Sequence, residues 1–380
     1  MTNNTPIRLG MVGGGQGAFI GAVHRIASRI DGQFNLVAGA LSSTPEKAMT
    51  SAIELGIAPD RSYSSYKEMA VAEAAREDGI EAVAIVTPNH MHAGPAIAFL
   101  NAGIHVICDK PLSSNMEDAL QIEAAVQSSG KLFILTHNYT GYPLIRQAKS
   151  MIKSELLGKL RMVQIEYVQD WLTEKIGDEN KQAAWRTDPS KSGIGGCVGD
   201  IGTHAYHLSR FVTGLELESL SADIDAFVKG RELDDNINLM LRFRGGAKGM
   251  LWASQIAVGN ENNLTLRVYG TKGGIEWAQE NPNQLWYTPF GEATRLITRG
   301  GSGTNEAANN VTRTPGGHPE GYLEGFATIY NEAATAIRHA KNNSQCINLL
   351  PNIDDGIEGM QFIQAVVKSS SKNSAWVNLK

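Results

Sequence analysis

The feature that most constrains this fold is a regular alternation of short apolar runs and helical segments between residues 7 and 136. Strands covered by helices on both faces are nearly continuous in apolar and β-branched residues, and five runs fit that description. These predicted strands are Ile7–Val12, Phe34–Leu41, Glu81–Thr87, His105–Cys108 and Leu132–Leu135. The alternation is typical of stacked βαβ units and predicts an α/β fold with a doubly wound parallel sheet.

Helix-boundary residues lie where this pattern requires them. The run Thr44-Pro45-Glu46 supplies an N-cap residue, a proline in the first helical position and an acidic first turn. Gly56, Gly103 and Gly130 stand where helices should end, because glycine accepts the left-handed conformation that often follows a helix. The boundaries therefore support the same fold as the apolar pattern.

After about Tyr142 the pattern changes. A predicted helix (Leu144–Leu156) and a strand-like run (Met162–Val168) precede a glycine-rich stretch (Ser192–Gly202) and a helix that runs through Arg210. Glycine-containing turns then separate longer strand-like runs, which is typical of an antiparallel, half-exposed sheet. Among these runs are Leu239–Phe243, Ala247–Ile256, Asn263–Tyr269 and Gly274–Ala278.

The rest of the chain completes a two-domain prediction. Residues 291–317 are rich in Gly, Thr and Asn and are predicted to form a long functional loop. Two helices, Tyr322–Lys341 and Asp355–Ser369, are predicted to close the chain. We therefore expect a dinucleotide-binding domain at 1–138 and an α+β domain at 139–380 with a large, mainly antiparallel open sheet. The last helix of the second domain is able to pack back on the first.

Composition excludes several classes of partner. The net charge of −5 and the scattered Lys and Arg residues argue against nucleic-acid binding. No apolar run approaches the roughly 20 residues that cross a bilayer, and the first residues lack the pattern of a signal peptide. Cys108, Cys197 and Cys346 form no CxxC pair, so neither a disulfide framework nor a zinc site is indicated. We expect a cytoplasmic protein with no metal and no membrane partner.

The first predicted strand runs into Gly13-Gly14-Gly15-Gln16-Gly17-Ala18, which matches G-x-G-x-x-A between a strand and a helix. Small residues there let the backbone approach a pyrophosphate, and the helix N-terminus supplies free N–H groups. The turn therefore predicts a bound NAD or NADP. No acid ends the second predicted strand, which removes a barrier to the 2′-phosphate of NADP. Ser42, Ser43 and Lys47 are candidates to bind that phosphate, although Ser43 and Thr44 fit a helix cap equally well.

Three further segments resemble the Gfo/Idh/MocA family, named for glucose–fructose oxidoreductase and inositol dehydrogenase. They are Val86-Thr87-Pro88-Asn89-His90-Met91-His92, then Gly103-Ile104-His105-Val106-Ile107-Cys108-Asp109-Lys110-Pro111, then Trp185-Arg186 followed by Asp200-Ile201-Gly202-Thr203-His204. The second is similar to the family's G-x-H-V-x-x-E-K-P, with Asp109 in place of Glu. Tyr269-Gly270-Thr271-Lys272-Gly273-Gly274 adds the family's G-T-x-G turn.

The resemblance spans essentially the whole chain. It implies a Rossmann domain, an open α/β domain whose sheet often forms an oligomer interface, and oxidation or reduction of a carbohydrate hydroxyl with NAD or NADP. It implies catalytic roles for Lys110, Asp200 and His204. The expected cofactor-binding residues are Gly13, Gly15, Gln16, Ala18, Phe19, Ser42, Ser43, Lys47, Thr87, Pro88, Asn89, His92, Asp109, Lys110, Trp185 and Arg186. The expected substrate-binding residues are Lys110, Asn138, Tyr142, Arg186, Asp200, His204 and His318.

Physical chemistry supports the three catalytic assignments. Oxidation of a carbinol carbon needs a base within hydrogen-bond reach of the hydroxyl, and histidine is the side chain that titrates near neutrality. Asp200 and His204 are four residues apart, so on a helix the carboxylate can orient the imidazole. A lysine stabilises the negative charge that develops on oxygen, and Lys110 follows a predicted strand at the end where such sheets bind ligands. The Lys110–Pro111 bond is a candidate cis peptide.

Each residue also has a plainer interpretation. Lys110 alone would be a solvated loop residue, and Asp200 and His204 alone would be a helix cap and a structural histidine. Asp200, His204 and His207 together suggest metal ligands, but no fourth ligand supports that interpretation. His318 opens a late helix after a proline-containing loop and is as well explained by that loop as by substrate contact.

We therefore predict an NAD(P)-dependent dehydrogenase acting on a sugar or cyclic polyol, and a homo-oligomer formed through the second sheet. One alternative is a glycoside hydrolase that oxidises, eliminates and then restores the cofactor. Another is a dinucleotide-binding sensor without catalysis.

Overall fold

The computed structural model describes residues 5–175, 181–342 and 349–379. The chain divides into two compact units, one built from 1–138 and 323–358 and the other from 139–322 and 359–380. Within the described residues, no helix is long and apolar enough to span a membrane.

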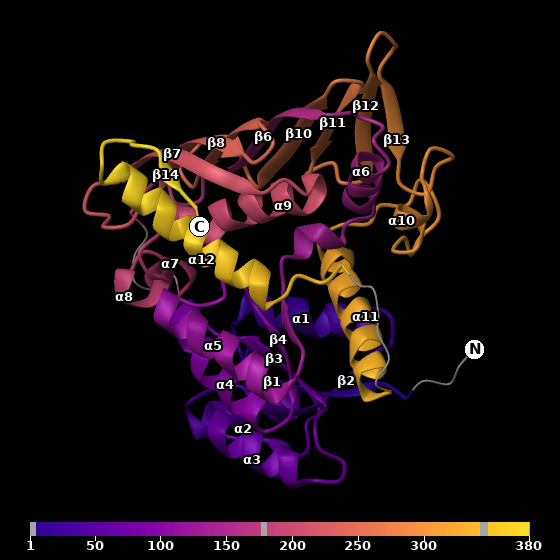
Figure 1. Ribbon diagram of the computed structural model, residues 1–380. Coiled ribbons are helices and arrows are strands. Elements are labelled where there is room, and N and C mark those ends of the chain that lie inside the picture. The colour runs from indigo at the N-terminus through magenta and orange to yellow at the C-terminus, as the bar shows by residue number, and fades with distance from the viewer. Residues whose placement is uncertain (1–4, 176–180, 343–348, 380) are drawn as a thin grey trace. The chain divides into compact units, whose positions relative to one another are not determined.

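Unit 1 is built on a parallel sheet of five strands in the order β2-β1-β3-β4-β5 (Figure 1). The prediction of a doubly wound parallel sheet is confirmed, and each strand lies within one residue or so of its predicted bounds. The strands are β1 (Ile7–Gly13), β2 (Phe34–Ala40), β3 (Ala82–Val86), β4 (His105–Cys108) and β5 (Phe133–Leu135). All their pairings are parallel.

Helices cover this sheet, and three of them end as predicted. Gly56, Gly103 and Gly130 follow helices with φ of 70°, 79° and 62°, in the left-handed region that favours glycine. Thr44 occupies the N-cap position of its helix without a side-chain hydrogen bond to it. The elements are α1 (Phe19–Ile30), α2 (Pro45–Glu54), η1 (Pro59–Arg61), α3 (Tyr66–Ala75), η2 (Asn89–Met91), α4 (Ala93–Asn101), α5 (Met116–Ser129), η3 (Asn138–Gly141) and α11 (Tyr322–Lys341).

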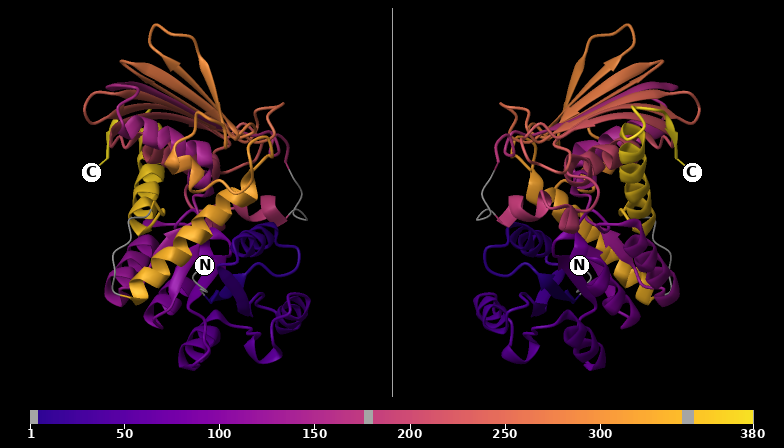
Figure 2. Two further views of the ribbon diagram at one scale, coloured as in Figure 1. Left: turned by 90° about the vertical axis from the view of Figure 1, so that its right-hand side faces the viewer. Right: turned by 90° about the vertical axis from the view of Figure 1, so that its left-hand side faces the viewer.

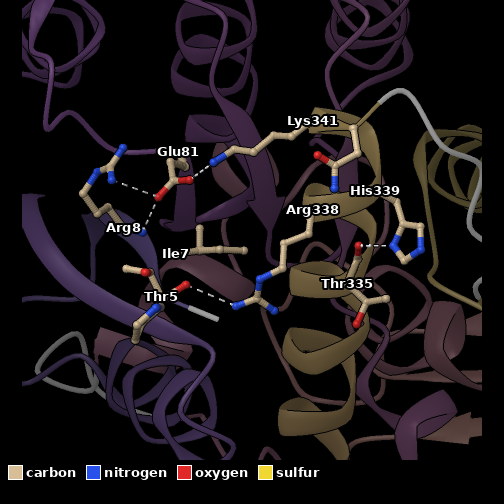
Figure 3. A pocket seen from close by; sticks show the side chains of 10 residues that line it. Thr5, Ile7, Arg8, Glu81, Thr335, Arg338, His339 and Lys341 are labelled. Carbon is tan, nitrogen blue, oxygen red and sulfur yellow. Dashed lines mark hydrogen bonds and ion pairs between the residues drawn. The ribbon is translucent and has the colours of Figure 1, made fainter. Parts of the chain in front are cut away.

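Helix α11 comes late in the sequence yet packs on the strands of unit 1, and its last residue, Lys341, is 260 positions from its partner Glu81. Glu81 accepts hydrogen bonds from the Arg8 backbone N–H (2.9 Å) and from Lys341, as Figure 3 shows. These residues, with Arg338, line a cavity of about 620 Å³ at the amino-terminal end of β1. Burial opposes ionisation of Glu81, but its contacts with Arg8 and Lys341 outweigh burial and hold its pKa below the ordinary value. The cluster ties the end of α11 to β1 and β3.

A neighbouring histidine in β4 makes stability depend on pH. His105 is buried, and its Nδ1 accepts a hydrogen bond from the Leu132 backbone N–H (3.0 Å), which requires a neutral ring. Burial, aided by Lys131 and Lys341, lowers the pKa of His105 to about 4. Below about pH 6.5 His105 binds a proton in the unfolded chain but not in the folded chain, so the folded state loses stability as the pH falls.

We predict that the free energy of unfolding decreases between about pH 6.5 and pH 4, with His105 contributing at most ~3 kcal/mol. Urea unfolding at several pH values measures this. In the variant His105→Gln, whose side-chain oxygen still accepts the Leu132 bond, that part of the slope should vanish. An unchanged slope in the variant would show that other groups cause it.

Unit 2 contains a sheet of nine strands in the order β13-β12-β11-β10-β6-β9-β8-β7-β14. Every pairing is antiparallel except that of β6 with β9, so the prediction of a large, mainly antiparallel sheet is confirmed. The strands are β6 (Leu160–Val168), β7 (Leu217–Asp225), β8 (Asn236–Phe243), β9 (Lys248–Ser254), β10 (Asn263–Gly270), β11 (Gly273–Ala278), β12 (Gln284–Pro289), β13 (Arg295–Thr298) and β14 (Val377–Asn378).

The predicted long loop at 291–317 is partly wrong, because it contains β13 and the short helix α10 (Glu306–Asn309). Strand β13 is exposed at the edge of the sheet, and its two apolar residues, Leu296 and Ile297, are adjacent, so it lacks the apolar alternation that marks a strand. The other helices of this part of the chain are α6 (Pro143–Lys153), α7 (Lys181–Arg186), α8 (Pro189–Ser192), η4 (Val198–Gly202), α9 (Thr203–Thr213) and α12 (Ile353–Ser370).

The two faces of the nine-stranded sheet differ. Helices α6 and α9 pack against one face, as Figure 2 shows. Apolar side chains on the strands are exposed in register: Met240 is paired with Met250, and Met162 with Tyr269. Trp286 and Leu296 continue this set on β12 and β13. We call these six residues the exposed apolar set.

Candidate active site

The glycine-rich turn after β1 has no room for a Cβ atom at Gly13, Gly14 or Gly15. Gly13 and Gly14 have φ of 79° and 72°, and a Cβ atom on Gly15 would lie 2.6 Å from the Leu41 carbonyl oxygen. Helix α1 begins directly afterwards at Phe19, with Ala18 as its N-cap residue. A bare backbone that leads into a helix N-terminus suits a pyrophosphate, so these residues fit a dinucleotide.

Close packing of α1 on β1 depends on a glycine that the sequence motif did not include. A Cβ atom on Gly21 would lie 2.4 Å from the Gly14 Cα atom. In a G-x-G-x-x-G motif the third glycine permits this approach. Here Ala18 stands in the third position, and Gly21, one turn further along, makes the contact.

The other predicted cofactor-binding residues around this turn differ in whether their polar groups are already hydrogen-bonded within the protein. The Gln16 N–H donates to Ser51 Oγ (3.2 Å) and its side chain to Glu54, so both groups already have partners. Phe19 is exposed. After β2, Ser42 Oγ accepts the Thr44 N–H (3.1 Å), while Ser43 and Lys47 are exposed and reachable by a ligand.

After β3, His92 has a supporting position. Its side chain is fully buried, with Nε2 2.8 Å from the Thr87 carbonyl oxygen and Nδ1 2.9 Å from the Pro111 carbonyl oxygen. Burial lowers the pKa of His92. The ring therefore joins the Thr87–Asn89 turn, which includes Pro88 and the buried Asn89, to the segment that carries Lys110.

Lys110 follows β4, and the Lys110–Pro111 bond is cis, as predicted. The adjacent Asp109 accepts a hydrogen bond from Thr136 Oγ1 (2.9 Å) and lies 3.8 Å from Nε2 of the buried His24. Burial opposes ionisation of Asp109, but His24, Lys110 and His92 outweigh it and hold its pKa below the ordinary value. An ionised Asp109 therefore stands beside the proposed catalytic lysine.

In unit 2, the buried carboxylate of Asp234 holds the segment Gly196–Val198, which precedes Asp200, by hydrogen bonds. Asp234 accepts hydrogen bonds from the Gly196 N–H (2.7 Å) and the Val198 N–H (2.8 Å). Burial raises the pKa of Asp234 to about 6. The turn η4 that follows is a π-helix, a geometry that is frequent at functional sites, and it carries Asp200.

Asp200 accepts two hydrogen bonds on one carboxylate oxygen. Arg186 Nε lies 3.0 Å from Oδ2, and Gln255 Nε2 lies 2.9 Å from the same atom. The Arg186 guanidinium in turn lies over two indole rings, 4.3 Å from the centre of Trp185 and 5.9 Å from that of Trp171. Trp185 and Arg186, predicted as site residues, are thus brought together with Asp200.

His204 is the second residue of α9 and is 7% exposed. Its ring meets those of Tyr139 (centres 4.9 Å apart) and Tyr167 (6.1 Å apart). The two tyrosine hydroxyls are 2.6 Å apart. Burial raises the pKa of both hydroxyls, so each keeps its proton at neutral pH.

The remaining substrate candidates have different surroundings. Asn138 and Tyr142 are buried, and Tyr142 packs on Trp277 and Tyr139.

His318 is exposed in a loop held by Arg299, which donates hydrogen bonds to the His318 carbonyl oxygen and to the buried Glu320 (3.0 Å). His207 is buried and stacks on Phe211. Among the described residues, no three His, Cys, Asp or Glu side chains form a set that could hold a metal ion.

Sequence reasoning missed Gln255, Tyr139 and Tyr167, along with Trp171. The proximity of Tyr167, Trp171 and Gln255 follows from strand register, since Val168 at the end of β6 pairs with Ser254 of β9 and with Asn263 of β10, whereas Tyr139 comes from η3. A polar or aromatic residue just beyond each strand end is a signal only when that register is known.

This fold defines a two-domain oxidoreductase that uses a nicotinamide dinucleotide. Matches with protein families agree with that class. Residues 7–139 match the oxidoreductase family with an NAD-binding Rossmann fold, and residues 145–276 match the GFO/IDH/MocA C-terminal domain. The chain belongs to the Gfo/Idh/MocA family of oxidoreductases, which confirms the resemblance seen in the sequence.

Several relatives match along the whole chain. An oxidoreductase structure from Sinorhizobium meliloti is 56% identical, with a TM-score of 0.90 over 98% of this chain and 100% of that one. An inositol dehydrogenase homologue from Azotobacter vinelandii, in complex with NADH and myo-inositol, is 32% identical, with a TM-score of 0.91 over 99% and 98%. Levoglucosan dehydrogenase of Pseudarthrobacter phenanthrenivorans is 29% identical over 98% of both chains.

Proposed function

We propose that this protein oxidises a secondary hydroxyl group of a cyclic polyol or sugar, with NAD as the hydride acceptor and His204 as the base. The observation that carries the proposal is the arrangement at the start of α9. There a buried histidine in an aromatic surround follows a carboxylate that Arg186 and Gln255 hold in place.

His204 takes the hydroxyl proton in this proposal. Alcohol oxidation leaves a positive charge on the base, and rings such as Tyr139 and Tyr167 favour a nearby cation. Asp200 lies one helical turn before His204 and supplies negative charge that favours the protonated imidazole. When bound, the nicotinamide supplies the acceptor for the hydride that leaves the carbinol carbon.

Lys110 is proposed to act on the same hydroxyl oxygen. An ammonium group there stabilises the negative charge that develops as the proton departs. Ionised Asp109 beside it, together with Pro111, whose carbonyl oxygen meets buried His92, supports a fixed lysine position.

NAD is the proposed cofactor. The family's Rossmann domain binds NAD, and the Azotobacter and levoglucosan dehydrogenase structures are complexes with NAD+ or NADH. Ser43 and Lys47 are exposed and are candidates to bind a 2′-phosphate, so NADP is the second candidate cofactor. Ring-shaped polyhydroxyl compounds are the proposed substrates, because myo-inositol and levoglucosan are the ligands in those relatives.

An absorbance screen at the reduced-nicotinamide band tests the proposal. The intact protein is mixed with NAD+ or NADP+ and a panel of polyols, monosaccharides and anhydrosugars that includes myo-inositol and levoglucosan. Net reduction of NAD+ with at least one compound is expected. A chromogenic glycoside is added to the same panel, and release of its aglycone without net cofactor change would favour the hydrolase. Binding of NAD+ without turnover of any compound would favour the sensor.

We also propose that a second copy of this chain covers the exposed apolar set. Methionines and aromatics paired across neighbouring strands form the kind of surface that protein interfaces bury. Sedimentation analysis should show a dimer or tetramer, and Met250→Lys should shift it toward the monomer. A wild-type monomer at micromolar concentration would contradict this.

A cytoplasmic location remains part of the proposal. Cys108 and Cys197 are buried free thiols, which suits a reducing compartment, and Cys346 lies outside the described residues.

A further inference from the structure

Trp171, which follows β6, sits at the start of a chain of hydrogen bonds. Its indole N–H donates to Gln169 Oε1 (2.9 Å). Gln169 Nε2 donates to Asn262 Oδ1 (2.7 Å), and the same oxygen accepts the Tyr167 hydroxyl (2.9 Å). The chain ends at the Tyr139 hydroxyl, 2.6 Å from that of Tyr167, beside His204.

The direction of this chain follows from its first member. An indole N–H can only donate, so Gln169 must present its oxygen to Trp171 and its NH2 group to Asn262. Asn262 therefore accepts through its side-chain oxygen, and the Tyr167 hydroxyl donates its single proton to that oxygen. Asn262 Nδ2 also donates to Gln279 Oε1 (3.1 Å), which agrees with this direction. All of these amides and hydroxyls can exchange their donor and acceptor roles, whereas the Trp171 indole cannot.

The consequence reaches His204. With the Tyr167 proton on Asn262, the Tyr139 hydroxyl donates across the 2.6 Å contact to Tyr167, and Asn262 is the other side chain that it interacts with. The Tyr139 proton is thereby held between the two hydroxyls, while the Tyr139 ring contacts the imidazole of His204 edge to face, with ring centres 4.9 Å apart. A base must present a lone pair to the substrate hydroxyl, and a donor hydroxyl on that lone pair would compete.

Trp171 has a second connection to the site. Its ring face lies 5.9 Å from the Arg186 guanidinium carbon, within the range of a cation–π contact, and Arg186 Nε donates to Asp200. One side chain thus touches both branches of the site, one that leads to Asp200 and one that leads to His204.

We infer that Trp171 is a positioning residue of the proposed oxidation: its N–H turns the Tyr139 proton away from His204, and its ring holds Arg186 against Asp200. The inference rests on the proposed function for its kinetic effect. The hydrogen-bond direction itself is a property of the chain with or without turnover.

The test is Trp171→Phe, which keeps an aromatic face for Arg186 and removes the N–H. Loss of one hydrogen bond predicts a fall in kcat of about 3- to 10-fold, with KM for the polyol and the affinity for NADH changed less than about 2-fold. Trp252→Phe is the matched control, since its indole N–H also donates to a side-chain amide, Asn236 Oδ1 (3.0 Å), and should leave kcat unchanged. Equal losses in the two variants would overturn the inference.

A double variant tests whether the chain acts as one unit. Tyr167→Phe breaks it downstream, so Trp171→Phe combined with Tyr167→Phe should lose little more activity than Tyr167→Phe alone. Independent, multiplying losses would contradict the inference. If Trp171→Phe does not fold, Gln169→Glu serves instead, because it keeps the acceptor for Trp171 and presents an acceptor to Asn262.

A readout without turnover separates this inference from the proposed function. In protein labelled with 15N-histidine, the His204 ring signals, assigned from His204→Asn, should shift in Trp171→Phe and not in Trp252→Phe. Unshifted signals in Trp171→Phe would refute the inference even if wild type reduces NAD+. A shift in protein that oxidises no polyol would support the inference and refute the proposed function.

Discussion

His204→Ala is expected to lower kcat/KM for the oxidised polyol by about 10²- to 10⁴-fold, the usual contribution of a positioned general base. Affinity for NADH should stay within a few-fold of wild type, because the dinucleotide-binding turn belongs to unit 1 and His204 to unit 2. Initial rates and fluorescence titration of NADH measure the two quantities. Imidazole added to the assay should restore part of the lost activity.

The matched control is His339→Ala, a histidine on the surface of α11 whose ring bonds to the Thr335 carbonyl oxygen. It should keep nearly full activity. Full activity in His204→Ala, or a loss there caused only by weaker NADH binding, would remove His204 from the reaction.

Lys110→Met is expected to lower kcat by about 10²- to 10³-fold, since it deletes the charge that opposes developing negative charge on the substrate oxygen. The methionine side chain is of similar length, so packing beside Pro111 is largely kept. Lys110→Arg should be intermediate, because it keeps the charge but changes the geometry of the donors.

Steady-state rates and the melting temperature of each variant separate lost chemistry from lost folding. Lys67→Met, on the exposed surface of α3, is the control and should behave as wild type. If Lys110→Met turned over at the wild-type rate, electrostatic stabilisation by this lysine would be excluded.

Much of the fold could be predicted, for identifiable reasons. Strands β3, β4 and β5 are buried along their whole length, and Gly103 and Gly130 with positive φ precede β4 and β5, so the apolar runs and their boundaries mark these strands in the sequence. Helix α11 has its predicted bounds of Tyr322 and Lys341. Strand β13 was missed, because it is a short exposed edge strand in which the apolar Leu296 and Ile297 are adjacent and show no alternation.

The residues of the candidate site also fall into two groups, those that a local motif reveals and those that only strand pairing brings together. Residues such as Asp200 and His204 stand in local motifs, and a motif can be recognised in one segment. Trp171 and Asn262 belong to no motif, since their connection exists only because β6 pairs with β10 in one particular register. Supporting contacts of this kind depend on pairing between distant segments, and local sequence patterns do not reveal the register of that pairing.

Direct transfer of deuterium tests the central claim, that the hydride leaves the same carbinol carbon whose hydroxyl proton His204 removes. The polyol or sugar found in the absorbance screen is deuterated at its carbinol carbons and incubated with the wild-type protein and NAD+. The account predicts NADH with one deuterium on the nicotinamide ring, and almost none in the same time with His204→Ala. NADH that forms without deuterium, or an undiminished rate in His204→Ala, would contradict it.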